Sequence, residues 1–247
     1  MIRSTAIIIA LPVLLVTCAD DPAPPNPNFD FSGMDKFWEV VEILEADLYP
    51  FPEVWDSLFA SPGYAALVES EFTREFFMEQ MQIAYMPSKA PMLKQRTKVM
   101  ADPYLRHYNQ VKHMKSLLAT HRQWLIEAPM MREVTRAVRQ YLPEHLFVNY
   151  PPPPIAFVIF ANDTRSYSPV VMDLLFSLDQ EEYLALRMGH EAHHYYRNKL
   201  LVYDPAQVRR RDRDVVWVLN RIQAEGLADR VDRRVLYFQE GSLENMP

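Results

Sequence analysis

The sequence predicts a predominantly helical α+β fold, in which a helical N-terminal lobe is followed by a smaller lobe with an antiparallel β element packed on two helices. Three observations lead to this prediction. Apolar residues recur at helical spacing through most of residues 34–141. A proline run, Pro151–Pro154, then breaks the helical pattern. Two β-branched and aromatic runs come next, and two longer helical segments follow them.

Composition places the chain among globular proteins with one substantial domain in two lobes. It has 247 residues, of which 49% are hydrophobic and 23% charged. The formal net charge of −6 leaves no basic excess, so nucleic acid is not an expected partner. Cys18 is the only cysteine, which excludes a disulfide within the chain and a thiolate nucleophile in the folded part. We place the helical lobe at residues 29–150 and the second lobe at residues 151–247, and the oligomeric state stays open.

The first residues have the pattern of an export signal. Residues 1–17 begin with a positive charge at Arg3 and continue as an apolar run that is too short to span a bilayer comfortably. The run ends in Leu15-Val16-Thr17-Cys18, which resembles the lipobox of bacterial lipoproteins, although Thr17 departs from the Gly, Ala or Ser that is usual before the cysteine. An ordinary signal peptide with an incidental cysteine is the alternative.

The lipobox resemblance implies that residues 1–17 are a lipoprotein signal peptide and that Cys18 carries a lipid anchor. Because two or more acyl chains hold a protein stably on a membrane, the expected location is the bacterial cell envelope, on its periplasmic or extracytoplasmic face. Residues 18–28 are rich in proline and polar residues, and we expect them to form an extended tether.

Residues 29–150 are expected to be helical. Helices are predicted over residues 34–46, 64–68, 71–85, 88–100, 104–127 and 129–141, with a short helix that begins at Pro52. Their methionine and aromatic stripes are typical of a helical core rather than of a cofactor pocket. His107, His113 and His121 are not spaced to share a helix face, so we interpret them as structural histidines, and His145 is expected in a loop with the same role.

The second lobe is predicted to combine two strands with two helices. The strands are expected at residues 155–160 and 169–176, paired antiparallel across a turn-rich segment. Asp179 has the pattern of an N-cap residue and should open a helix over residues 180–198. The last helix is predicted over residues 214–238.

The first of these two helices carries the motif His190-Glu191-Ala192-His193-His194. His190 and His194 lie one helical turn apart, so their imidazoles can converge on one metal ion. Glu191 flanks the same face and can take a proton from a metal-activated water, which suits metal-assisted hydrolysis. The motif supplies two ligands, and a metal site of this kind needs a third.

The last helix offers candidates for the third ligand. Glu225 and Asp229 share a face with Val218 and Ile222, so two carboxylates interrupt an otherwise apolar stripe. A carboxylate on a buried face needs a partner. Glu225 can be the third ligand, and Asp229 can accept a hydrogen bond from a ligand imidazole and fix its orientation. An exposed or salt-bridged acidic pair is the alternative.

Two glycines lie next to these candidate ligands. The chain has five glycines, and Gly189 and Gly226 are both inside the predicted helices. Glycine in a helix costs about 1 kcal/mol relative to alanine, so we expect a reason for each, namely a close approach of the two helix backbones.

The motifs resemble a known group of enzymes. H-E-x-x-H followed by E-x-x-x-D is similar to the gluzincin metallopeptidases, of which thermolysin is the familiar member. The more specific pair, H-E-x-H-H with E-G-[LI]-A-D, resembles uncharacterised bacterial families of zinc-dependent peptidases. The resemblance implies one Zn²⁺ per chain held by His190, His194 and Glu225. It further implies that Glu191 is the general base and that Asp229 is the partner of His190.

The function that this resemblance implies is a membrane-anchored zinc metallopeptidase, which hydrolyses peptide bonds of a peptide or protein substrate by a zinc-activated water with Glu191 as general base. The alternative is a non-catalytic zinc-binding envelope lipoprotein that binds a partner, with a closed coordination shell. A di-iron carboxylate bundle is disfavoured, because it needs two Glu-x-x-His pairs and only Glu191 with His194 qualifies.

Two further parts of the substrate site are the oxyanion donor and the strand that pairs with the substrate. Thermolysin-like enzymes continue into a helical subdomain with His or Tyr donors to the oxyanion, whereas this sequence ends soon after Glu225. We expect the donor among Tyr195, Tyr167, Arg165 and His193. An extended substrate is expected to pair with the strand predicted at residues 169–176.

Overall fold

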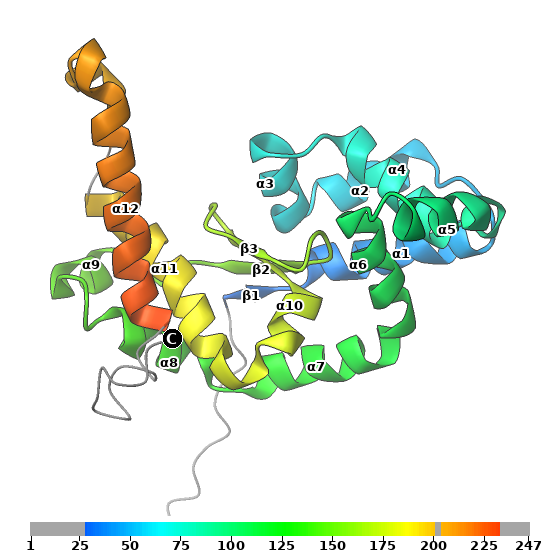
Figure 1. The fold of residues 1–247 in the computed structure, drawn as a ribbon. Coiled ribbons are helices and arrows are strands. Elements are labelled where there is room, and N and C mark those ends of the chain that lie inside the picture. The colour runs from blue at the N-terminus through cyan, green and yellow to red at the C-terminus, as the bar shows by residue number, and fades with distance from the viewer. Residues whose placement is uncertain (1–27, 201–203, 233–247) are drawn as a thin grey trace, which may run out of the picture.

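The computed structural model describes residues 28–200 and 204–232. A small sheet lies between two groups of helices, which confirms the predominantly helical α+β fold (Figure 1). The predicted signal peptide, Cys18, nearly all of the tether and the end of the last predicted helix lie outside the described residues. Within the described residues, every helix is too short or too polar to cross a bilayer.

The helices that precede the central strands follow the predicted pattern with two differences. They are α1 (Ser32–Glu45), α2 (Pro52–Phe59), α3 (Pro62–Ser70), α4 (Arg74–Tyr85), η1 (Pro87–Lys89), α5 (Ala90–Lys98), α6 (Pro103–His113), α7 (Lys115–Glu127), α8 (Met130–Val138) and α9 (Glu144–Asn149). The helix predicted over residues 104–127 is divided into α6 and α7, because Met114 leaves the helical conformation with φ −112° and ψ 9°. The loop expected around His145 is the short helix α9.

The sheet has four strands in the order β1-β2-β4-β3. These strands are β1 (Phe29–Asp30), β2 (Ile155–Val158), β3 (Thr164–Arg165) and β4 (Val170–Asp173). The predicted antiparallel pairing of the two main strands is wrong, since β2 and β4 run parallel. The turn-rich segment between them contains β3, which pairs antiparallel with β4 and so reverses the chain before β4 begins. Because β4 has neighbours on both sides, it cannot pair with a substrate as predicted, and the edge strand next to it is β3.

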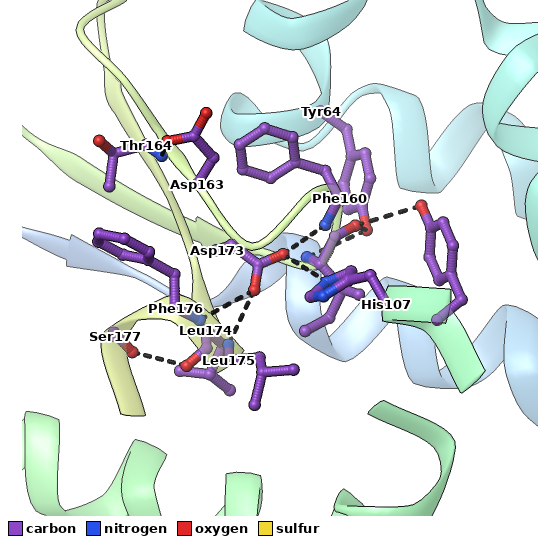
Figure 2. A network of polar contacts seen from close by, with 12 residues as sticks. Tyr64, His107, Phe160, Asp163, Thr164, Asp173, Leu174, Leu175, Phe176 and Ser177 are labelled. Atoms are coloured by element: carbon purple, nitrogen blue, oxygen red, sulfur yellow. Dashed lines mark hydrogen bonds and ion pairs between the residues drawn. The ribbon is translucent and has the colours of Figure 1, made fainter. Parts of the chain in front are cut away.

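Asp173 explains why β4 ends earlier than predicted. Its side chain is fully buried at the end of the strand, and one carboxylate oxygen accepts the backbone N–H groups of Leu175 and Phe176. Asp173 is therefore the N-cap of α10 (Leu174–Asp179). The other oxygen accepts the N–H of Phe160 at 2.6 Å and lies 2.9 Å from Nε2 of His107 (Figure 2). This network joins β4, α6, α10 and the segment that follows β2.

The remaining helices end the described chain. They are η2 (Glu181–Tyr183), α11 (Leu184–Leu200), η3 (Pro205–Gln207), η4 (Arg210–Asp212) and α12 (Arg213–Asp232). The predicted N-cap role of Asp179 is wrong, because the apolar run before it is already helical and Asp179 is the last residue of α10. α11 begins at Leu184 and covers the H-E-x-x-H motif.

α11 and α12 pack side by side along the C-terminal half of α12 (Figure 1). A Cβ at Gly189 would lie 2.8 Å from Cγ1 of Val231, so the close approach predicted there is confirmed. At Gly226 the prediction is wrong, since a Cβ would meet nothing within 4 Å. The apolar stripe of α12 is not buried as expected, because Val218 and Ile222 are 44% and 64% exposed. Both residues lie in the N-terminal half of α12.

One cluster of buried apolar side chains runs through the fold. It includes Phe37 of α1, Phe157 of β2 and Val231 of α12. β1, near the start of the described chain, also pairs with β2, which follows the proline run. The division into lobes at residue 150 stays a prediction.

Candidate metal centre

The two histidines of α11 and the glutamate of α12 meet at one point. Nε2 of His190 and Nε2 of His194 are 3.1 Å apart. The Oε2 atom of Glu225 lies 3.6 Å from the first nitrogen and 3.3 Å from the second. Periodicity along α11 accounts for the histidine pair, and the packing of α12 on α11 brings in the carboxylate.

These three distances fit one zinc ion. Ligand atoms at about 2.0–2.1 Å from a tetrahedral zinc lie about 3.3 Å from one another. Two nitrogens and one carboxylate oxygen are also a donor set that zinc prefers. The group contains no fourth histidine, cysteine, aspartate or glutamate from the described part of the chain. The donor set and its spacing therefore suit a zinc ion that keeps one position for water or substrate.

A comparison with protein families also points to zinc. The family described as "Putative zinc dependent peptidase (DUF5700)" matches residues 55–245, well over half of the chain. The chain belongs to this family. Searches of the curated proteins and of the solved structures found no significant match. The matched range contains every candidate ligand, so zinc dependence and peptide hydrolysis are the family's description of this region.

Glu191, the general base expected in a zinc-dependent peptidase with this motif, is almost buried beside the ligands, with 9% of its surface exposed. Its Oε1 atom accepts a short hydrogen bond from the hydroxyl of Thr164 in the edge strand β3. Burial raises the pKa of Glu191, although the Thr164 hydrogen bond and His190 oppose the shift. The carboxyl group is thus oriented by the sheet and shifted toward the pKa range that suits proton transfer near neutral pH.

Two aspartates of α12 lie behind His190. Oδ2 of Asp232 is 3.2 Å from Nδ1 of His190, and Oδ1 of Asp229 is 3.8 Å from the same atom. The sequence predicted Asp229 as the partner of His190, and that role stays a prediction. In the structure, Asp232 is the nearer of the two carboxylates. Asp232 was missed, although it follows Glu225 by two helical turns and shares its face.

Asp232 is also paired with a cation. Its side chain is 3% exposed and accepts a hydrogen bond of 2.6 Å from Arg187. His190, Asp229 and Asp232 form a second group of potential ligands. Because the Arg187 guanidinium already neutralises Asp232, we interpret this group as support for His190 rather than as a second metal site.

The charge states of the histidines follow from their surroundings. Burial, together with the neighbouring His190, lowers the pKa of His194. Burial alone would lower the pKa of His190, but Asp232, Glu191 and Glu225 outweigh it and raise the pKa. Zinc binds the neutral imidazole, so ion and proton compete most strongly at His190.

The residues expected to stabilise an oxyanion are mostly occupied elsewhere. Arg165 and Tyr167 both donate to the carboxylate of Glu71. His193 is fully buried, which lowers its pKa to about 4. A cation that the sequence did not single out lies closer to the ligands, because Arg221 reaches 3.3 Å from the second carboxylate oxygen of Glu225.

Two of the four histidines interpreted as structural, His107 and His121, are buried with polar partners, whereas His113 and His145 are exposed. His107 is buried against Asp173, and Nε2 of His121 lies 3.0 Å from the Ser177 hydroxyl. Burial lowers the pKa of His121, so its neutral form is favoured in the folded chain. Neither belongs to the group that includes His190.

Proposed function

We propose that the chain is a membrane-anchored zinc metallopeptidase of the gluzincin type, with Glu191 as general base. The observation that carries the proposal is the convergence of His190, His194 and Glu225 on one point beside a buried glutamate. Three protein ligands are the pattern of catalytic zinc sites, whereas structural sites use four. The group of three ligands thus favours an enzyme over the non-catalytic lipoprotein.

Each residue of the site would have a separate role in peptide hydrolysis. Zinc, when bound, polarises the peptide carbonyl and makes a water molecule more acidic. Glu191 accepts the proton of the attacking water and later delivers it to the leaving amine. Thr164 holds Oε1 of Glu191 and so fixes the carboxyl group relative to the histidines. Arg221 is a candidate donor to the carbonyl oxygen, because its guanidinium lies beside Glu225.

The edge strand β3 is the candidate for pairing with an extended substrate. Thr164 and Arg165 form this strand, and one of them touches the general base. Arg165 is bound to Glu71 at the end of α3, which fastens the strand to the helices. A peptide added along this edge would pass the buried carboxyl of Glu191.

The test of catalysis is the variant Glu191→Gln. It should bind one zinc per chain, as the parent chain does, and hydrolyse a mixed peptide library about 10²- to 10⁴-fold more slowly, because the proton acceptor is lost. Glu182→Gln, an exposed glutamate shortly before α11, is the matched control and should leave turnover unchanged. Undiminished hydrolysis by Glu191→Gln, or a parent chain without bound zinc, would overturn the proposal.

The membrane anchor is proposed from the sequence alone and has its own test. Cys18 follows an apolar run that resembles a lipoprotein signal. When expressed in bacteria, the parent chain should incorporate labelled palmitate and fractionate with membranes, and Cys18→Ser should do neither. Equal fractionation of the two chains would argue for an ordinary signal peptide.

A further inference from the structure

The N-terminal half of α12 exposes an unusual amount of apolar surface. α11 ends at Leu200, and its Arg197 already reaches Asn220 and Gln223. Before these residues α12 extends past its neighbour and projects from the body of the fold (Figure 1). Four of its apolar side chains are exposed: Val215 by 61%, Val218 by 44%, Leu219 by 59% and Ile222 by 64%.

These four side chains lie on the same face of α12 as the metal ligand Glu225. At 100° per residue, Val215, Val218, Leu219, Ile222 and Glu225 all fall within an arc of about 120°. Ile222 is one turn from Glu225, about 4.5 Å along the helix axis, and Val215 is about 15 Å from it. We name the four apolar residues the apolar ridge. It begins at the candidate zinc site and leads away from it.

Position and chemistry together indicate what covers the ridge. A row of neighbouring exposed apolar side chains, unlike single scattered ones, is typical of a binding site. A polypeptide whose scissile bond lies at the zinc site must continue along the neighbouring surface, and on the α12 side that surface is the ridge. Accordingly, we propose that the apolar ridge binds an apolar stretch of the substrate polypeptide, on one side of the scissile bond. This inference rests on the proposed peptidase function.

The length of the ridge sets the length of the substrate stretch. An extended chain advances about 3.3 Å per residue, so 15 Å corresponds to about four or five residues. Apolar side chains within this distance of the scissile bond would pack on Ile222, Leu219 and Val215 in turn. The substrate class is therefore polypeptides with an apolar segment next to the cleavage position, in an extended conformation.

The helix also provides a matched control. Trp217 is 53% exposed, and its position on the helix is about 150° from the centre of the ridge. A partner that simply covers the projecting helix, such as a lipid surface or a second copy of the chain, would use Trp217 as well. A substrate that leads from Glu225 would contact the ridge and leave Trp217 free.

The experiment compares peptide binding by Leu219→Ser/Ile222→Ser and by Trp217→Ser, both in the zinc-loaded Glu191→Gln chain so that the peptide is not consumed. The probes are two decapeptides of equal charge, one with leucine and one with serine at alternate positions. The chain with an intact ridge should prefer the leucine peptide. Leu219→Ser/Ile222→Ser should bind it roughly ten-fold more weakly, and Trp217→Ser should bind it unchanged.

The outcomes separate this inference from the proposed catalysis. Loss of leucine-peptide binding in the ridge variant, with one zinc still bound, supports the ridge even if the parent chain hydrolyses nothing. Equal affinity of the ridge variant and its parent overturns the inference even if hydrolysis is observed. An equal loss in Trp217→Ser overturns it too. So does a ridge variant that loses only self-association in sedimentation, or only binding to phosphatidylcholine–phosphatidylglycerol vesicles.

Discussion

The Asp173 network and the candidate zinc site both bring a histidine close to a carboxylate, and they differ in how completely their polar atoms are satisfied. At the Asp173 network, one oxygen accepts two N–H groups, and the other accepts a third and contacts His107. At the candidate zinc site, two imidazole nitrogens face each other at 3.1 Å beside the carboxylate of Glu225. The first arrangement is complete within the protein, whereas the second has the donor atoms that a cation would need.

The two places also differ in how exposed their side chains are to solvent. Asp173 and His107 are 0% and 6% exposed and lie where four elements meet. Around the candidate zinc site, the buried Oδ1 atom of Asp232 has no hydrogen-bond partner, and Glu225 is 43% exposed. A buried network whose polar atoms have hydrogen-bond partners stabilises the fold. A cluster with an unpaired polar atom and an exposed carboxylate is typical of a binding site.

The largest expected effect is on stability at the Asp173 network. Asp173→Ala leaves three backbone N–H groups without their acceptor, so the free energy of unfolding in urea should fall by about 3–5 kcal/mol. Asp35→Ala removes a half-exposed carboxylate that binds Arg122 and should cost less than about 1 kcal/mol. Equal losses in the two variants would remove the distinction between a complete network and a surface pair.

Removal of zinc by a chelator should affect the candidate zinc site and leave the Asp173 network unchanged. Zinc at 100 to 1,000 times its dissociation constant stabilises a protein by about 2.7–4.1 kcal/mol, so a chelator should lower the Tm of the parent chain. His194→Ala, which lacks one ligand, should have a Tm that no longer responds to chelator. Asp173→Ala should have a lower Tm than the parent chain, and the chelator should lower that Tm further. A parent chain with the same Tm in both conditions would contradict the site.

The smallest expected effect distinguishes the two aspartates behind His190. Asp232→Asn should weaken zinc binding by about 10- to 100-fold, because it alters the group that orients the ligand imidazole. Asp229→Asn should have a smaller effect, since its carboxylate is 3.8 Å from the ring. Competition with a zinc-binding dye measures both affinities. The reverse order would restore Asp229 as the orienting residue.

The sequence predicted the fold class and most helices, because apolar periodicity reports helices directly. It failed where a single polar residue changes the local structure. Asp173 lies inside an apolar run and was taken as part of a strand, yet it ends β4 and caps α10. The parallel pairing of β2 and β4 depends on the short strand β3, whose two residues carry no strand periodicity. Strand direction was therefore not predictable from the pattern.

The candidate ligands were predictable because helical spacing fixes which side chains share a face. His190 and His194 follow from one helix, and Glu225 and Asp229 from the next. Asp232 could have been found by extending the same periodicity by one turn. Thr164 could not, since only tertiary packing brings it to Glu191. The exposure of Val218 was also hidden, because the sequence does not show where α11 stops covering α12.

We infer that His190, His194 and Glu225 hold one zinc ion, and anomalous diffraction at the zinc edge from crystals of the zinc-loaded chain would show its position. One peak is expected, about 2.0–2.2 Å from Nε2 of both histidines and from a carboxylate oxygen of Glu225. A peak between Nδ1 of His190 and the two aspartates, or no peak near α11, would contradict the claim.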